Sequence, residues 1–323
     1  MIERLKLENF TAFTKLDVSF SPGINIFVGE NGSGKTHVLK VLYSFLAAIS
    51  KEEAIPTKIA NVFLPDNFIG LIKRGINSAN ANIAIYKNGE ELSYAIEKSE
   101  TVSLFSRVNN FQKQIEKENA VYIPVKEMIA NAPGFASLYK ERYLHFEEVY
   151  ADIISKALLP SKREISPAYS SMCKKLEHYI GGSVYSRDEQ FYLHGNTFDL
   201  EFSLLAEGLR KLGLLWVLLQ NGSLDKGSVL FWDEPEANIN PQLIPVLVDV
   251  LLELQRNGVQ LFLATHDYNV AKYFEVKRKD GDKVLYHSLF KTDNGVKSQS
   301  DEYFGKLQEN SIIDADEKLL DEV

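Results

Sequence analysis

Eight residues near the start of the chain have the types and spacing that bind the phosphates of a nucleotide. They are Gly29, Glu30, Asn31, Gly32, Ser33, Gly34, Lys35 and Thr36, and they match the pattern G-x-x-x-x-G-K-[ST] in full. Glycines let several backbone N–H groups point at phosphate oxygens without a Cβ clash. Lys35 would reach the β and γ phosphates, and the Thr36 hydroxyl would bind Mg²⁺. The pattern therefore predicts a nucleotide site.

Two adjacent carboxylates follow an apolar run later in the chain. Asp233 and Glu234 come directly after Val-Leu-Phe-Trp at 229–232. An aspartate at a strand tip beside a phosphate loop is placed to bind Mg²⁺, which assigns that role to Asp233. Glu234 would face the γ-phosphate and orient or deprotonate the attacking water. Acidic pairs at strand ends are often only solvated, so the phosphate loop is what favours the functional interpretation.

A histidine ends the next apolar run. His266 follows Leu-Phe-Leu-Ala-Thr at 261–265, one strand–helix–strand step after the acidic pair. A lone histidine is more often structural, but this position predicts that Nε2 bonds the γ-phosphate or the water. The other five histidines, among them His37, His145 and His178, are interpreted as surface or structural residues.

The periodicity of apolar residues predicts the elements that position these groups. Strands are expected at residues 2–7, 24–28, 120–124, 193–203, 228–232 and 260–264, and a hairpin at 83–96. Helices are expected at 36–49, 204–220 and 241–256, with a helical rhythm from 135 to about 180 and a charged, helix-like end. Alternating strands and helices favour an α/β fold with a parallel-cored sheet, and the block at 135–180 favours a second lobe.

Composition excludes several classes of protein. The chain has 323 residues, a formal net charge of −8 and 45% hydrophobic residues, which is typical of a soluble globular protein. The mild acidity argues against an extended basic surface for nucleic acid. Cys173 is the single cysteine, so there is no internal disulfide and no multi-cysteine metal site. Because no uncharged apolar run reaches 18 residues and the start alternates like a strand, we expect a cytoplasmic protein without membrane partners.

The three motifs, in this order, resemble the ABC-type ATPase head. The opening LKLENFTAFTKLDVSFSPGINIFVGENGSGKT is similar to RecF, the heads of structural-maintenance-of-chromosomes (SMC) proteins and the OLD-type ATPases. The stretch FWDEPEANINP resembles OLD-like and related prokaryotic defence ATPases. The resemblance extends from Ile2 to the tail of the chain.

This resemblance implies an α/β fold of the P-loop NTPase class. We expect a mixed-to-parallel core sheet, an inserted helical lobe and an antiparallel β-subdomain. Residues 1–323 would form a single ABC-type ATPase domain, with a nucleotide-binding lobe at 1–125 and 200–300 and a helical lobe at 126–199.

The resemblance also implies residues that act across a dimer. Ala206, Glu207 and Gly208 occupy the place of a signature loop that binds the γ-phosphate held by the opposite subunit. They depart from the usual Leu-Ser-Gly-Gly-Gln, because Ala206 has no hydroxyl and Glu207 adds a charge, and the alternative is a plain helix N-terminus. Residues 237–240 would communicate across the dimer, ending at Asn240 where many heads have aspartate. Glu127 would take the place of a glutamine-bearing loop, unless it belongs to an ordinary charged loop.

Function follows as an expectation from the same resemblance. Two copies facing head to tail would sandwich two MgATP molecules, with Lys35, Glu234 and His266 as catalytic groups and Thr36 and Asp233 on the metal. Hydrolysis of ATP to ADP and phosphate would open the dimer, since only the triphosphate is shared by both copies. The switch would gate a partner effector in bacterial anti-phage defence or DNA maintenance.

The same residues bear on other architectures and functions. The stretch between Lys35 and Asp233 has no sustained heptads, which excludes a long coiled-coil arm. The stretch after His266 is too short for a fused nuclease domain, which needs about 100 residues, so a nuclease effector would be a separate chain. The main alternative is a RecF-like DNA-binding repair clamp, for which 73–74 and 277–279 supply basic residues. A transporter's nucleotide-binding subunit is the weaker alternative.

Overall fold

A six-stranded sheet forms the centre of the molecule. The structure is a computed structural model that describes residues 1–75, 80–97, 117–142, 144–197 and 199–322. The strand order is β13-β12-β3-β11-β10-β6. Five strands run parallel, namely β12 (Val284–Thr292), β3 (Ile24–Val28), β11 (Gln260–Ala264), β10 (Val229–Asp233) and β6 (Ala120–Ile123). At one edge, β13 (Gly295–Asp301) is antiparallel to β12.

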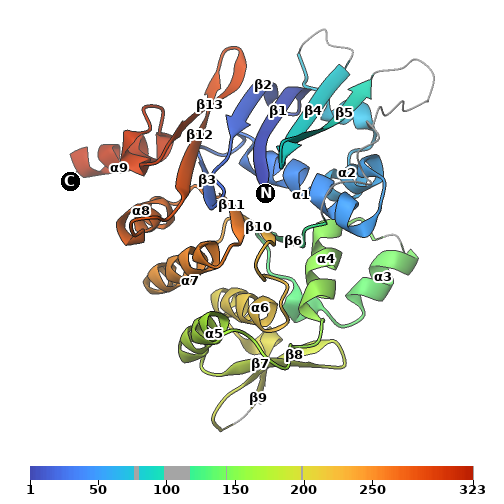
Figure 1. Ribbon diagram of the computed structural model, residues 1–323, viewed down its shortest axis with the longest axis vertical. Coiled ribbons are helices and arrows are strands. Elements are labelled where there is room, and N and C mark those ends of the chain that lie inside the picture. The colour runs from blue at the N-terminus through green and yellow to red at the C-terminus, as the bar shows by residue number, and fades with distance from the viewer. Residues whose placement is uncertain (76–79, 98–116, 143, 198, 323) are drawn as a thin grey trace.

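Both faces of this sheet are buried, which explains why its strands are continuously apolar. In β10, Leu230 and Trp232 belong to one core cluster, and Val229 and Phe231 belong to the other. The first cluster includes α6 (Glu207–Gln220) and α7 (Ile244–Arg256), and the second includes α1 (Lys35–Lys51). Figure 1 shows α1 and α7 on opposite sides of the sheet.

A second, antiparallel sheet packs over α1. Its order is β2-β1-β4-β5, formed by β1 (Ile2–Phe10), β2 (Phe13–Ser19), β4 (Asn80–Lys87) and β5 (Glu90–Glu97). β4 and β5 are the expected hairpin. The Gln260 side chain ties the two sheets together, because it bonds the backbone N–H and C=O of Ile2 at 2.9 and 2.8 Å. The short helix α2 (Ile55–Phe63) packs beside α1.

The remaining elements form a lower lobe and the C-terminal part (Figure 1). The lower lobe contains α3 (Phe135–Arg142), α4 (Glu148–Ala157), α5 (Pro167–Ile180), β7 (Ser183–Arg187), β8 (Gln190–His194) and β9 (Asp199–Glu201). α5 packs against α6, so α6 joins this lobe to the sheet. In the C-terminal part, α8 (Tyr268–Lys277) follows β11 and α9 (Ser311–Asp321) ends the described chain. Across the described residues, none of the helices has the length and apolar character needed to cross a membrane.

The expected fold class is confirmed, but some element boundaries are wrong. Within the expected strand at 193–203, the described residues are strand only at the end of β8 and in the three-residue β9, and a short 3-10 helix begins at Phe202. The helix expected from 204 begins at Glu207, because Leu205 and Ala206 are extended with ψ of 150° and 140°. The sequence analysis also missed β2, α2, α8 and the β12–β13 hairpin, whose apolar residues are spread over short or mixed runs.

Candidate functional site

The phosphate loop connects β3 to α1. Gly29, Gly32 and Gly34 have positive φ angles of 140°, 78° and 91°. A Cβ on Gly29 would lie 2.2 Å from the Leu289 carbonyl oxygen, and one on Gly34 would lie 2.5 Å from the Phe13 ring. Packing therefore requires glycine at both ends of the loop.

The start of α1 is suited to an anion. Gly34 is its N-cap, and no side chain caps the helix there. The first amides of a helix lack intrahelical partners and carry its positive dipole end. The Ser33 hydroxyl beside them is buried without a hydrogen-bond partner among the described residues. This set of unused donors fits a phosphate group.

Lys35 links the loop to the acidic strand end. Its Nζ donates to the carbonyl oxygens of Gly29 at 2.6 Å and Glu30 at 3.0 Å. Burial lowers the pKa of this ammonium, and the carboxylates of Glu234 and Asp233 oppose that shift. The lysine expected to hold phosphates is thus electrostatically coupled to both expected acids.

Asp233 lies at the end of β10 in a buried position. Burial raises the pKa of its carboxyl group, while a hydrogen bond from Thr36 and one from Tyr122 lower it. The Tyr122 hydroxyl is 3.4 Å from Oδ2. A hydroxyl and one carboxylate fit Mg²⁺, which takes few protein ligands beside substrate phosphates. The described residues contain no cluster of three or more His, Cys, Asp or Glu that could hold a metal by itself.

Glu234 and His266 form a more exposed pair. His266 Nδ1 lies 3.1 Å from Glu234 Oε1, and their side chains are 48% and 26% exposed. Glu234 has a φ of 47°, which is uncommon for a residue other than glycine. Its amide donates to the Ala264 carbonyl at 2.8 Å, so the ends of β10 and β11 are joined. The pair can hold a water or a phosphate oxygen at the carboxyl ends of β10 and β11.

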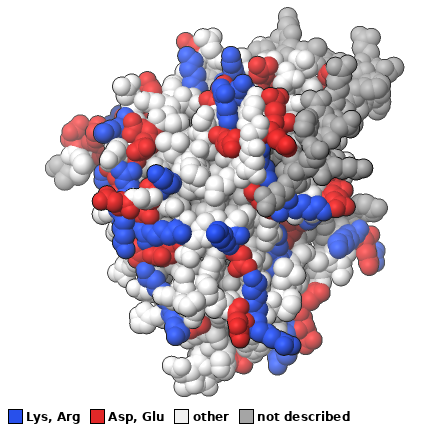
Figure 2. Space-filling view, viewed as in Figure 1, with Lys and Arg blue, Asp and Glu red and all other residues white. Residues whose placement is uncertain are grey.

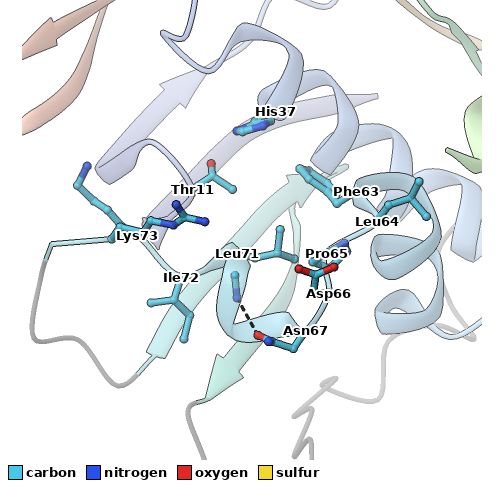
Figure 3. Close-up of a pocket in the computed structure, with 12 residues that line it drawn as sticks. Thr11, His37, Phe63, Leu64, Pro65, Asp66, Asn67, Leu71, Ile72 and Lys73 are labelled. Carbon is cyan, nitrogen blue, oxygen red and sulfur yellow. Dashed lines mark hydrogen bonds between the residues drawn. The ribbon is translucent and has the colours of Figure 1, made fainter. Parts of the chain in front are cut away.

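Pockets lie on two sides of the phosphate loop. One of about 660 Å³ is lined by the start of α1, the β1–β2 turn and residues 63–74. Figure 3 shows His37 and Thr11 projecting towards this segment. Thr11 Oγ1 and His37 Nδ1 are buried without hydrogen-bond partners among the described residues, and burial lowers the pKa of His37 to about 4. A second pocket of about 730 Å³ is lined by 29–31, His266 and α9.

The expected signature loop lies at the start of α6. Ala206 is the N-cap and Glu207 the first helical residue. Gly208 packs against the turn after Glu234, since a Cβ there would lie 2.6 Å from the Asn238 carbonyl oxygen. Leu204, four positions before Gly208, is 68% exposed. In one chain, this segment therefore contacts residues 237–240 and presents an apolar side chain outward.

Glu127 is buried and has polar contacts within the chain. Its Oε1 accepts hydrogen bonds from the amides of Ile129 and Ala130, and Oε2 lies 2.9 Å from Arg210 Nε on α6. Burial raises its pKa, and Arg210 opposes the shift. In this structure Glu127 connects the loop after β6 to α6.

Several residues of the site escaped the sequence analysis. Tyr122 bonds Asp233, and buried Glu236 accepts from Thr265 Oγ1 at 2.5 Å. Lys211 lies behind Glu234, and His37, which we interpreted as a surface or structural residue, lines the pocket formed with residues 63–74. Glu236 lies two positions after Glu234 in the sequence, and this closeness could have pointed to it. The others become visible only through contacts between distant segments.

Two protein-family models match the chain, each over less than half of it. An AAA ATPase domain matches residues 1–132, and an AAA domain described as a putative AbiEii toxin of a type IV TA system matches residues 137–271. Among curated proteins, the DNA replication and repair protein RecF of Lactobacillus acidophilus is 26% identical over 165 residues, which are 47% of this chain and 41% of the relative. RecF of Corynebacterium jeikeium is 33% identical over 92 residues, 28% of this chain and 19% of the relative. The chain thus spans less than half the length of these relatives.

Solved structures resemble the whole described architecture. An SMC head bound to the C-winged helix domain of ScpA has a TM-score of 0.62 at 16% identity, covering 95% of this chain and 99% of that one. The SMC head domain from Thermotoga maritima has a TM-score of 0.54 at 14% identity, covering 93% and 99%. These likenesses show the fold.

Proposed function

We propose that this chain, an ABC-type ATPase head of the RecF/SMC group, binds MgATP at the loop after β3 and hydrolyses it to switch a dimer between closed and open states. The observation that carries the proposal is the convergence of the phosphate loop, Asp233 and Glu234 with His266 at one edge of the central sheet. AAA ATPase models match over both halves of the chain, which supports nucleotide binding.

Each residue has a role that its surroundings support. The amides of the loop and Lys35 would hold the phosphates, and Thr36 and Asp233 would hold Mg²⁺. When bound, Mg²⁺ neutralises charge on the phosphate oxygens. Glu234 would orient and deprotonate the attacking water. Because its contact with Glu234 uses Nδ1, His266 has Nε2 available for the γ-phosphate.

The pocket lined by His37 and Thr11 would receive the nucleoside. It begins at the residue after Thr36 and contains two buried polar atoms without partners, which a base or ribose could satisfy. His37 would be neutral there at pH 7, since its pKa is about 4.

The start of α6 would act on the nucleotide of the second copy. Ala206 offers no hydroxyl, so backbone N–H groups around Gly208 would supply the contact. The exposed Leu204 beside them gives this face an apolar anchor. ATP would stabilise the closed dimer because both copies then touch the same γ-phosphate.

Steady-state kinetics test the proposed hydrolysis. We expect Glu234→Gln to lower kcat about 100-fold or more with little change in ATP affinity, because the general base is lost and the phosphate contacts remain. Lys35→Ala should abolish ATP binding. Purified wild-type protein that neither binds nor hydrolyses MgATP would refute the proposal.

What the switch controls is proposed from the relatives. We favour gating of a separate effector, such as a nuclease, in anti-phage defence or DNA maintenance, since one family model is described as a putative toxin. The RecF matches favour the second candidate, a DNA-binding clamp. Basic and acidic side chains are interspersed on the face in Figure 2, without one continuous basic surface. DNA binding that requires ATP and weakens steeply with salt would favour the clamp.

A further inference from the structure

Lys211 is a fully buried cation directly behind the turn that carries Glu234. It comes from the second turn of α6, and its exposed fraction is 0%. Its Nζ lies 2.7 Å from the carbonyl oxygen of Ala237 and 3.4 Å from that of Glu234. Lysines are almost never fully buried unless paired, so this position demands a specific partner. The partner here is the backbone of the Glu234–Ala237 turn.

That turn contains backbone strain. Glu234 is in the left-handed region with φ of 47°, which persists only where surrounding contacts hold it. Its amide is bonded to Ala264, and its carbonyl accepts from the Ala237 amide at 3.1 Å. Lys211 adds a charged donor to the first and last carbonyls of the turn. A charge-assisted donor is stronger than a neutral one.

The surroundings keep the Lys211 anchor in place. Burial lowers its pKa, while the nearby carboxylates of Glu207, Glu236 and Glu234 favour the charged form. Gly208, on the preceding turn of α6, lies close against the Asn238 backbone. The helix and the turn are therefore in direct contact at Gly208 as well as at Lys211.

We propose that Lys211 is a positioning residue that holds the Glu234 carboxylate in place for its work on the attacking water. The ammonium contacts backbone carbonyls, so it acts through Glu234 and not on the nucleotide itself. The inference rests on the proposed function, because it assigns Lys211 a part in the same hydrolysis.

The test compares Lys211→Met in two backgrounds. Methionine removes the donor and the charge at similar length. In the wild-type background we expect kcat to fall about 10- to 100-fold, as for other residues that orient a reacting group, with KM for ATP nearly unchanged. In the Glu234→Gln background, where the base is already lost, Lys211→Met should lower the single-turnover rate no further. Lys211→Arg should recover most of kcat.

Lys58→Met is the matched control, because Lys58 is also 0% exposed but lies between α1, α2 and α4. It should lower the melting temperature and leave kcat unchanged. An equal loss from Lys211→Met in both backgrounds, an unchanged kcat, or a rise in KM alone would overturn the role of Lys211. A wild type without turnover would overturn the proposed function itself. If Lys211→Met does not fold, Lys211→Gln replaces it, and a kcat for Gln above that for Arg would contradict the proposal.

Discussion

Asp233 and Glu234 are neighbours in the chain, but their carboxyl groups have different surroundings. Asp233 is buried beside Thr36 and Tyr122, and burial raises its pKa. Glu234 turns out of the strand with its φ of 47° and meets His266 at a partly exposed position. A fixed, buried carboxylate suits a metal ligand, and a more exposed one suits contact with water. The turn at Glu234 is what separates the two roles.

Tyr122 offers a test of the metal site. Tyr122→Phe removes the hydroxyl that bonds Asp233 and keeps the ring packed against Tyr43. We expect the Mg²⁺ concentration for half-maximal activity to rise about 10-fold, because residues that orient a metal ligand commonly affect affinity by this factor or more. At saturating Mg²⁺, kcat should approach the wild-type value.

The measurement is ATPase activity across a Mg²⁺ titration. Tyr169→Phe is the control, because it also removes a buried hydroxyl, bonded 2.8 Å from the Leu224 carbonyl. A Tyr122→Phe curve that overlays the wild type would show that Asp233 does not depend on this contact.

Motif spacing predicts the residues that we propose to meet the nucleotide, because the chemistry of a phosphate site fixes their order along the chain. The residues that support them could not be found in this way. Tyr122 lies 111 positions from Asp233, and Lys211 lies 23 from Glu234, so only the folded sheet brings each pair together. In sequence alone, a buried tyrosine or lysine that supports a site cannot be distinguished from one elsewhere in the core.

Among the elements, α1, α2 and α4 are joined by a buried group of charges. Asp152 of α4 accepts from Lys58 Nζ and Tyr43 Oη at 2.6 and 2.5 Å, and it also pairs with Lys51. Lys58 pairs with Glu148 at 3.0 Å as well. The helix that follows the phosphate loop is thereby fixed to the lower lobe.

Asp152→Asn should destabilise the protein by about 3 to 5 kcal/mol, because it leaves Lys58 buried with much of its countercharge removed. The free energy of unfolding in urea measures this. Glu52→Gln is the control, since Glu52 pairs with Lys117 at an exposed site, and it should leave the free energy of unfolding nearly unchanged. A loss for Asp152→Asn no larger than the control's would contradict this account of the cluster.

Long, uniform apolar runs made β3, β10, β11 and α1 predictable from sequence. The start of α6 was not, because the apolar pattern continues through Leu204 and Leu205 while the backbone is extended at Leu205 and Ala206. The short elements β9 and α2 were not predictable either, because so few residues give no clear periodic pattern and their structure depends on neighbouring elements.

For the molecule as a whole, the buried His287 contributes to how stability depends on pH. His287 lies in the core sheet, where its ring nitrogens contact Ser300 and Asn25 and burial lowers its pKa to about 3. Between about pH 6.5 and pH 3 the unfolded chain binds a proton that this folded histidine does not. Stability therefore falls as the pH drops through this window, by about 1.4 kcal/mol per pH unit for one such group.

His287→Gln should lower the free energy of unfolding at neutral pH. The change of this free energy with pH should become smaller by about 1.4 kcal/mol per pH unit. Urea unfolding at several pH values between 7 and 4.5 measures both. A slope unchanged by His287→Gln would mean that other groups account for the acid sensitivity.

We propose that MgATP closes two copies of this chain on each other through the phosphate loop. The most direct measurement is light scattering of Glu234→Gln at micromolar concentration, with and without MgATP. We predict a monomer without nucleotide and a stable dimer with MgATP, and adding Lys35→Ala should abolish the dimer. A Glu234→Gln protein that binds MgATP and stays monomeric would contradict the claim.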